Sequence, residues 1–179
     1  VLQSALDAAI ELTGAERGFL ILNKRNVATN APQRSSLSVS VFRNMDQTAV
    51  TKSAKEFSHT IASQVIVSGK PLLSLDALSD SNLSQQVSVH ALNLKSVLCV
   101  PVRTEEGVLG ALYLDDRVRT ASFNEHDADL VIAVADQVGI ALTKATLLDQ
   151  LKHRAEELES EKHDIVRVLE DTEHQLERL

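Results

Sequence analysis

Residues 96–116, SVLCVPVRTEEGVLGALYLDD, contain two apolar runs on either side of a short charged turn. The first run, 96–102, is almost continuously apolar, which favours a strand that is buried on both faces. Glu105-Glu106-Gly107 predicts a tight turn, and a second apolar run follows it at 108–114. The stretch therefore predicts a buried β-hairpin.

Further helices and strands are predicted upstream of this hairpin. Alternation of apolar and polar residues predicts strands, and apolar positions at helical spacing predict helices. Gly14 and Gly69 predict the ends of two helices. In chain order, the predicted elements are helix 2–12, strands 18–22 and 37–42, helix 57–68, strand 72–75 and a short helix at 87–92. With the hairpin and a C-terminal helix, this order predicts an α+β fold with a largely antiparallel sheet.

A long C-terminal helix is predicted from Asn124 to Leu179. Asn124 stands three residues before Asp127, so the two side chains are expected to cap the start of the helix. Neither glycine nor proline follows Gly139. An uninterrupted helix over this range would be ~80 Å long at ~1.5 Å per residue.

The last part of this helix has the heptad pattern of a coiled coil. Apolar residues follow one another in steps of four and three, a period of about 3.5 residues. Lys162 at a core position is typical of a two-stranded coil with a defined register, and Arg154 would face Glu159 of a parallel partner. A solvated single helix is the alternative, but the sustained heptads favour a dimer. The expected core residues are Leu151, Ala155, Leu158, Lys162, Ile165, Leu169, Thr172 and Leu176.

Composition and charge limit the classes of function. The chain has 179 residues and a net charge of −7, which argues against direct nucleic-acid binding because phosphate contacts need clustered Lys and Arg. Its single cysteine, Cys99, excludes an internal disulfide and a cysteine-built zinc site and fits a cytoplasmic setting. No membrane span is expected, because no apolar run approaches ~20 residues. The chain begins in mid-pattern at Val1 and is interpreted as part of a longer polypeptide.

Three segments together resemble the GAF domain family. They are the helix and strand at 57–72, the hairpin at 96–115, and the C-terminal helix at 130–142 preceded by Phe123 and Asp127. The resemblance covers residues 1–148 as a sensor domain and leaves 149–179 as a coiled-coil linker. It implies a GAF/PAS-like central antiparallel sheet with terminal helices on one face and a ligand pocket under short helices on the other.

The resemblance leaves the ligand and the output open. GAF domains bind cyclic nucleotides, bilins, haem, metabolites or nothing, so the cofactor is unknown. Phe123 and Asp127 fit the cyclic-GMP signature, but Asp115 and Asp116 replace its Asn-Lys pair. Bilin attachment needs an exposed thiol, whereas Cys99 is expected to be a small core residue. A GAF domain followed by a coil is similar to sensor regions of sigma-54-dependent activators with an AAA+ ATPase, of histidine kinases and of diguanylate cyclases.

The expected pocket combines sheet and loop residues. Alternate residues of a strand face opposite layers, and the predicted lining is Phe42, Ser96, Leu98 and Tyr113, with Asp80 and His90 closing over it. Tyr113 and His90 each have a polar tip on a bulky body, which suits ligand orientation. Core packing and loop surface are the ordinary alternatives. A ligand-free dimerisation module, plugged by Phe42 and Leu92, is the second functional hypothesis.

The sequence contains no recognisable catalytic constellation. No glycine-rich phosphate loop or nucleophile–base spacing is present. Asp115 and Asp116 are interpreted as solvated turn residues, with cation binding as the alternative. His163, followed by Asp164, resembles a kinase phospho-acceptor, but an exposed outer-position histidine is favoured. The prediction is a non-catalytic, homodimeric regulatory domain that senses an unknown small molecule. It would signal to an output domain in the same polypeptide, a sigma-54-dependent activator in preference to a histidine kinase.

Overall fold

The computed structural model describes residues 1–24, 36–43 and 59–176, and for Lys24, Ser36, Ser88 and 170–176 it describes the backbone alone. The chain forms two compact units, Val1–Ala141 and Leu142–Leu179. The first unit ends before the boundary predicted after residue 148. The second unit consists of the C-terminal part of one helix.

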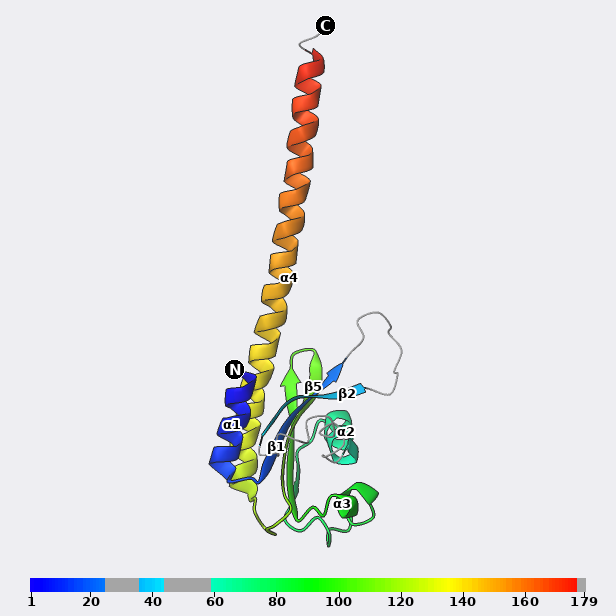
Figure 1. Ribbon diagram of the computed structural model, residues 1–179, viewed down its shortest axis with the longest axis vertical. Helices are drawn as coiled ribbons and strands as arrows, with labels where there is room; N and C mark the ends of the chain where they lie inside the picture. Colours follow the sequence, from blue (N-terminus) through cyan, green and yellow to red (C-terminus); the bar gives the residue numbers. More distant parts are fainter. Residues whose placement is uncertain (25–35, 44–58, 177–179) are drawn as a thin grey trace. The chain divides into compact units, whose positions relative to one another are not determined.

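The order of helices and strands is the predicted one (Figure 1). The apolar periodicity of each segment therefore located each element to within a few residues. The elements are α1 Leu2–Thr13, β1 Arg17–Lys24, β2 Ser36–Arg43, α2 His59–Ser68, β3 Leu72–Ser74, α3 Val87–Ala91, β4 Ser96–Thr104, β5 Gly107–Asp116 and α4 Glu125–Leu176.

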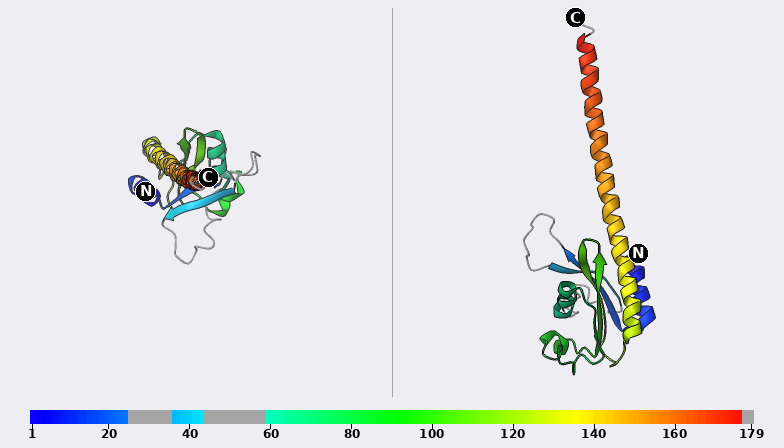
Figure 2. Two further views of the ribbon diagram at one scale, coloured as in Figure 1. Left: turned by 90° about the horizontal axis from the view of Figure 1, so that it is seen from above. Right: turned by 180° about the vertical axis from the view of Figure 1, so that it is seen from behind.

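The first unit is built on a five-stranded sheet in the order β2-β1-β5-β4-β3. All of its strand pairs are antiparallel. Figures 1 and 2 show α1 and the first turns of α4 side by side on one face of the sheet, with α2 and α3 on the other. This is the predicted α+β fold, in which helices cover both faces of a central antiparallel sheet.

Local signals end α1 and begin α4 as the sequence predicts. Gly14 has a left-handed φ of 66°, and its N–H donates to the carbonyl of Ile10 over 2.8 Å. At the start of α4, Asn124 Oδ1 accepts from the N–H of Asp127 at 3.1 Å, and Asp127 Oδ2 accepts from the N–H of Asn124 at 2.9 Å. The reciprocal bonds form a capping box, which stabilises a helix start by about 1 kcal/mol.

The sheet separates two layers of buried apolar side chains. The layer between the sheet and α2 contains Phe19, Ile21, Ile61, Ala62, Val65, Ile66, Ala77, Leu83, Val89, Leu94, Val97, Cys99, Ala111 and Tyr113. Alternate strand residues point to the other face, toward α1 and α4. That layer includes Leu20, Leu98, Val100, Leu112 and Leu114 from the strands and Leu6, Ala9, Val131, Ala135 and Val138 from the helices, all buried.

A β-bulge decides which side chains of the central hairpin share a face. Next to the turn, Thr104 and Arg103 of β4 pair regularly with β5. The register then shifts between Arg103 and Val102, and Leu109 is an extra residue in β5. A shift of one residue exchanges the two faces of a strand. Leu98 therefore pairs with Leu114, and Tyr113 lies on the other face of the sheet.

Helix α4 lies close against β4 at Gly139. A Cβ built on Gly139 would overlap the backbone carbonyl oxygen of Arg103 in β4. The absent side chain lets the helix backbone lie directly on the strand.

Helix α4 also has the composition of a membrane-spanning helix. It contains an 18-residue window with a mean hydropathy of 1.5, long and apolar enough to cross a membrane by length and composition alone. Val131, Ala135 and Val138 of this helix are buried inside the first unit. Core packing therefore accounts for part of the apolar composition, as in the core helices of globular domains.

Candidate functional site

The predicted sheet residues of the pocket fall on two faces. Tyr113 belongs to the layer beneath α2, where its ring lies edge-on to Phe19 with centroids 5.9 Å apart, and Phe42 packs against the same layer. Leu98 and Ser96 lie on the opposite face, so they cannot line one surface with Tyr113, contrary to the prediction. A hairpin without the bulge pairs Leu98 with Tyr113, and the prediction did not include the bulge.

The space beneath α2 is occupied by packed side chains in the described part of the chain. Phe42 and Leu92 are partly buried against the apolar layer. Cys99 is completely buried in it, and burial raises the pKa of its thiol far above the usual value. Cys99 is therefore a core residue, as predicted. The packing of Phe42 and Leu92 is the arrangement that the ligand-free hypothesis expects here.

The two predicted loop residues have different surroundings. His90 is exposed at the end of α3, where its Nε2 lies 2.6 Å from the carbonyl oxygen of Ser84. This contact ties the exposed His90 to the segment before α3. Asp80 lies at the wall of a hollow of about 300 Å³ beside α2.

This hollow is bounded by the end of α2, the connection to β3 and the segment 80–83. Its lining consists of Gln64, Val65, Ser68, Lys70, Pro71, Leu72, Asp80, Asn82 and Leu83. Asp80 is fixed by two hydrogen bonds: Ser74 Oγ donates to Oδ2 at 3.0 Å and the N–H of Asn82 donates to Oδ1 at 2.8 Å. The sequence had pointed to Asp80 alone, because the other lining residues come together only through the packing of α2.

Sequence analysis missed a buried ion pair on the sheet. Arg17 donates to both carboxylate oxygens of Asp115, from Nε at 2.8 Å and from NH2 at 2.6 Å, with both side chains at most 1% exposed. The guanidinium also lies 5.4 Å from the centroid of the Phe19 ring, within the range of a cation–π contact. Burial lowers the pKa of Arg17, but the hydrogen bond to Asp115 and its charge raise it above the usual value.

Asp116 is likewise buried and not a solvated turn residue. Its carboxylate accepts from the backbone N–H groups of Val118 and Arg119 at 2.8 and 2.7 Å, from Arg119 Nε at 2.9 Å and from Ser122 Oγ at 2.8 Å. Arg119 NH2 also donates to the carbonyl of Gly14 at 2.6 Å. Asp116 thus ties the segment that leads into α4 to the end of α1.

These bonds determine the ionisation of Asp116. Burial by itself raises the pKa of this carboxyl, but the backbone N–H groups, Ser122 and Arg119 together hold it below its ordinary 3.8. The ionised carboxylate therefore stabilises the fold above the pKa of the unfolded chain. This contribution is lost as the pH falls through the lower pKa of the folded state.

Asp116→Asn is expected to lower the free energy of unfolding at pH 7 by roughly 2 kcal/mol, because an amide cannot accept all four bonds. The difference from the unaltered chain should shrink below about pH 4, where Asp116 of the unfolded chain becomes protonated and the folded chain follows at its lower pKa. Urea unfolding at pH 7 and pH 3 measures both values. Asp129→Asn, at an exposed position of α4, is the control. An equal difference at the two pH values would contradict this role of the charge.

No metal centre is found in the described residues. Nowhere in the described part of the chain do three or more His, Cys, Asp or Glu side chains come together so that they could hold a metal ion. Asp115 and Asp116 are instead engaged by protein donors.

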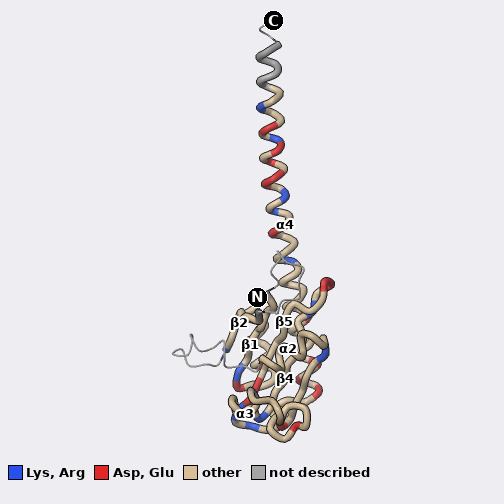
Figure 3. The backbone as a smooth tube through the Cα atoms, turned by 90° about the vertical axis from the view of Figure 1, so that its right-hand side faces the viewer, with Lys and Arg blue, Asp and Glu red and all other residues tan. Residues whose placement is uncertain are grey.

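The second unit exposes an apolar stripe along α4. Leu151, Leu158, Ile165 and Leu169 are 67%, 50%, 61% and 57% exposed, and Ala155 and Lys162 are exposed as well. Thr172 and Leu176 lie where side chains are outside the described residues. We call Leu151, Leu158, Ile165 and Leu169 the α4 stripe. Figure 3 shows positive and negative residues interspersed along the same part of the helix.

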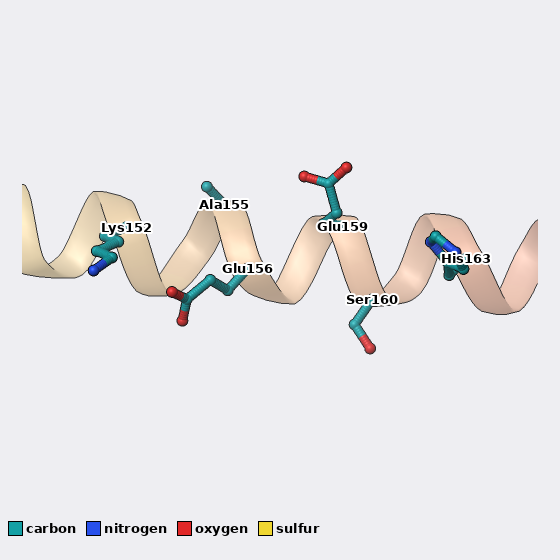
Figure 4. A pocket seen from close by; sticks show the side chains of 6 residues that line it. All are labelled: Lys152, Ala155, Glu156, Glu159, Ser160 and His163. Carbon is teal, nitrogen blue, oxygen red and sulfur yellow. The ribbon is translucent and has the colours of Figure 1, made fainter.

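A concave surface on this part of α4 has one wall only. Its six lining residues all come from the helix: Lys152, Ala155, Glu156, Glu159, Ser160 and His163. Figure 4 shows Glu159 and Ser160 pointing to opposite sides of the helix, with no second element facing them. His163 is exposed here, as predicted for an outer position. The surface is therefore no enclosed ligand site.

Several known proteins are similar to this chain. Residues 1–142 match the family model of the GAF domain. A curated relative, hybrid signal transduction histidine kinase G of Dictyostelium discoideum, is 27% identical over 88 residues, which are 48% of this chain and 3% of that protein. The chain therefore corresponds to a small part of that relative.

Solved structures share the fold at low identity. A GAF domain of Synechocystis sp. PCC6803 in its photoproduct state is 16% identical, with a TM-score of 0.61 over 83% of this chain and 94% of that one. A domain of a putative two-component sensor histidine kinase from Sinorhizobium meliloti 1021 is 13% identical, with a TM-score of 0.60 over 84% and 94%. A free methionine-R-sulfoxide reductase of Thermoplasma acidophilum is 15% identical, with a TM-score of 0.55 over 77% and 86%.

These likenesses concern the fold, and the family follows from the model match. The match extends over the whole first unit, including the sheet, the helices on both of its faces and the start of α4. The chain belongs to the GAF domain family.

Proposed function

We propose that this chain is a non-catalytic, cytoplasmic regulatory domain that forms a homodimer through α4. In this proposal a small molecule binds the first unit, and paired α4 helices pass the signal to an output domain in the same polypeptide. The observation that carries the proposal is the α4 stripe. Four large apolar side chains at heptad spacing are at least half exposed in the single chain.

The α4 stripe calls for a partner on energetic grounds. Burial of a Leu or Ile side chain contributes about 1.5–3 kcal/mol, whereas an isolated helix in water is only marginally stable. A second copy offers the same stripe, and side chains at this spacing interdigitate in a two-stranded coil.

The charges on α4 are compatible with a parallel arrangement. In the single chain Arg154 donates to Glu157 over 3.0 Å, and both side chains are exposed. In a parallel pair Arg154 would instead reach Glu159 of the other copy. An exposed ion pair is worth at most about 1 kcal/mol, so exchanging one for the other costs little.

The proposal for the output domain has a general part, a signalling output, and a specific part, its class. A signalling output is supported by the relative, which is a hybrid histidine kinase, and by membership of the GAF family. Among the outputs that the sequence suggested, this relative favours a histidine kinase over a sigma-54-dependent activator. The ligand-free dimerisation module remains the second candidate, because Phe42 and Leu92 pack into the layer beneath α2.

A double substitution in the α4 stripe tests the dimer. Leu158→Asp with Ile165→Asp places four carboxylates in the proposed core, so the dissociation constant is expected to rise by at least ~100-fold, about 3 kcal/mol. Sedimentation velocity over a concentration series measures the change. Ser160→Asp, an exposed position on the same helix, is the matched control and should remain dimeric. A monomeric unaltered chain, or a double variant that still dimerises, would overturn the proposal.

A further inference from the structure

The hollow beside α2 brings opposite charges to one small space. Lys70, in the connection between α2 and β3, and Asp80 both line it, together with Gln64 and Asn82. Among the described residues no ion pair links Lys70 to Asp80. The lining of the hollow therefore includes one cation and one anion that are not paired with each other.

Apolar side chains form the inner part of the same hollow. Val65 and Leu83 are each 1% exposed and belong to the core layer beneath α2, and Leu72 packs against that layer. Ligand sites commonly combine an apolar lining with a few fixed polar groups. The volume of about 300 Å³ is at the small end of such sites, so the hollow fits a small molecule.

The Asp80 carboxylate is held in a fixed position. Ser74, itself buried, donates to one oxygen and the backbone of Asn82 to the other. A carboxylate has about four acceptor positions, so further ones remain for a cationic group. The backbone of Asp80 is also held in place. Its N–H donates to the carbonyl of Asp76, and its carbonyl accepts from the N–H of Ser84. A carboxylate positioned before binding costs less conformational entropy when a ligand arrives.

We propose that this hollow binds a small zwitterion with an apolar side chain, of the α-amino acid class. The ligand carboxylate pairs with the ammonium of Lys70, and the ligand ammonium pairs with Asp80. The apolar side chain lies against Val65, Leu72 and Leu83. This inference rests on the proposed regulatory function and names the chemical class of its signal.

Thermal unfolding of the full chain tests the proposal. The twenty protein amino acids are added separately at about 10 mM, and binding to the folded state raises the midpoint by a few degrees where Kd is about 1 mM or lower. We expect the shift with an aliphatic amino acid such as leucine. Two singly charged analogues of leucine are 4-methylpentanoic acid, which lacks the ammonium, and isoamylamine, which lacks the carboxylate. Each should give a much smaller shift, because it can form only one of the two ion pairs.

Substitutions in the hollow locate the effect. Lys70→Gln and Asp80→Asn should each weaken the affinity for the ligand at least tenfold and so reduce the shift of the midpoint. Lys144→Gln replaces an exposed lysine of α4 and should leave the shift unchanged. If Asp80→Asn fails to fold, Lys70→Gln alone decides the question.

Two outcomes overturn the inference: no amino acid shifts the midpoint, or an analogue with one charge shifts it as much as leucine does. Sedimentation of the same samples keeps the proposals apart. A stable dimer without any shift contradicts the amino-acid site alone, and a monomer contradicts the regulatory dimer.

Discussion

Asp115→Ala is expected to lower the free energy of unfolding of this chain by about 3–5 kcal/mol. The substitution removes the two Asp115 oxygens that accept from Arg17, whose side chain is 1% exposed. The guanidinium stays charged and would then be buried without the charge of Asp115. Urea unfolding followed by circular dichroism measures the loss.

Two further variants show whether the charge is the cause. Asp7→Ala breaks an exposed pair, in which the side chains of Arg43 and Asp7 are 32% and 51% exposed, and should cost less than about 1 kcal/mol. Arg17→Met with Asp115→Leu removes both buried charges and should cost much less than Asp115→Ala alone. A double variant as unstable as the single one would mean that the shape of the pair matters and not its charge.

Gly139→Ala should destabilise the chain by about 3 kcal/mol or more, because the new Cβ is fixed to the backbone of α4 and meets the backbone of β4. The added Cβ overlaps the carbonyl oxygen of Arg103, and no flexible side chain can move aside. The sign of this stability change distinguishes a close backbone contact from an exposed helix position. In an exposed part of a helix the same substitution stabilises by about 1 kcal/mol, through helix propensity alone.

The midpoint of thermal unfolding gives the measurement for Gly139→Ala. Gln137→Ala, at an exposed position two residues away on the same helix, should stay within about 0.5 kcal/mol of the unaltered chain. If Gly139→Ala raises the midpoint, α4 does not pack directly on β4.

The helices and strands were predictable because their signals are local. The capping pair Asn124 and Asp127, and the glycine that ends α1, are decided by residues a few positions apart. The antiparallel character of the sheet followed from the hairpins. The exposed heptad residues of α4 could likewise be found from spacing alone.

The site was harder to predict because it depends on contacts between distant residues. Arg17 and Asp115 are 98 positions apart, and nothing near either residue indicates its partner. The face of Tyr113 depends on one extra residue in β5, which apolar patterning does not show in a run that is buried on both sides. Asp80 was found, but Lys70 joins it only through the packing of α2.

The place of β1 between β2 and β5 imposes an order on pairing during synthesis in the cell. β1 pairs with its neighbour in sequence, β2, and also with β5, where Arg17 meets Asp115 across 98 positions. A ribosome adding about 5–20 residues per second needs roughly 5–20 s to supply that distance. Until then the inner edge of β1, with the apolar run Phe19–Leu22, lacks its partner strand. Unpaired apolar edges recruit other chains, so nascent copies of this protein should depend on chaperones that shield this segment until β5 emerges.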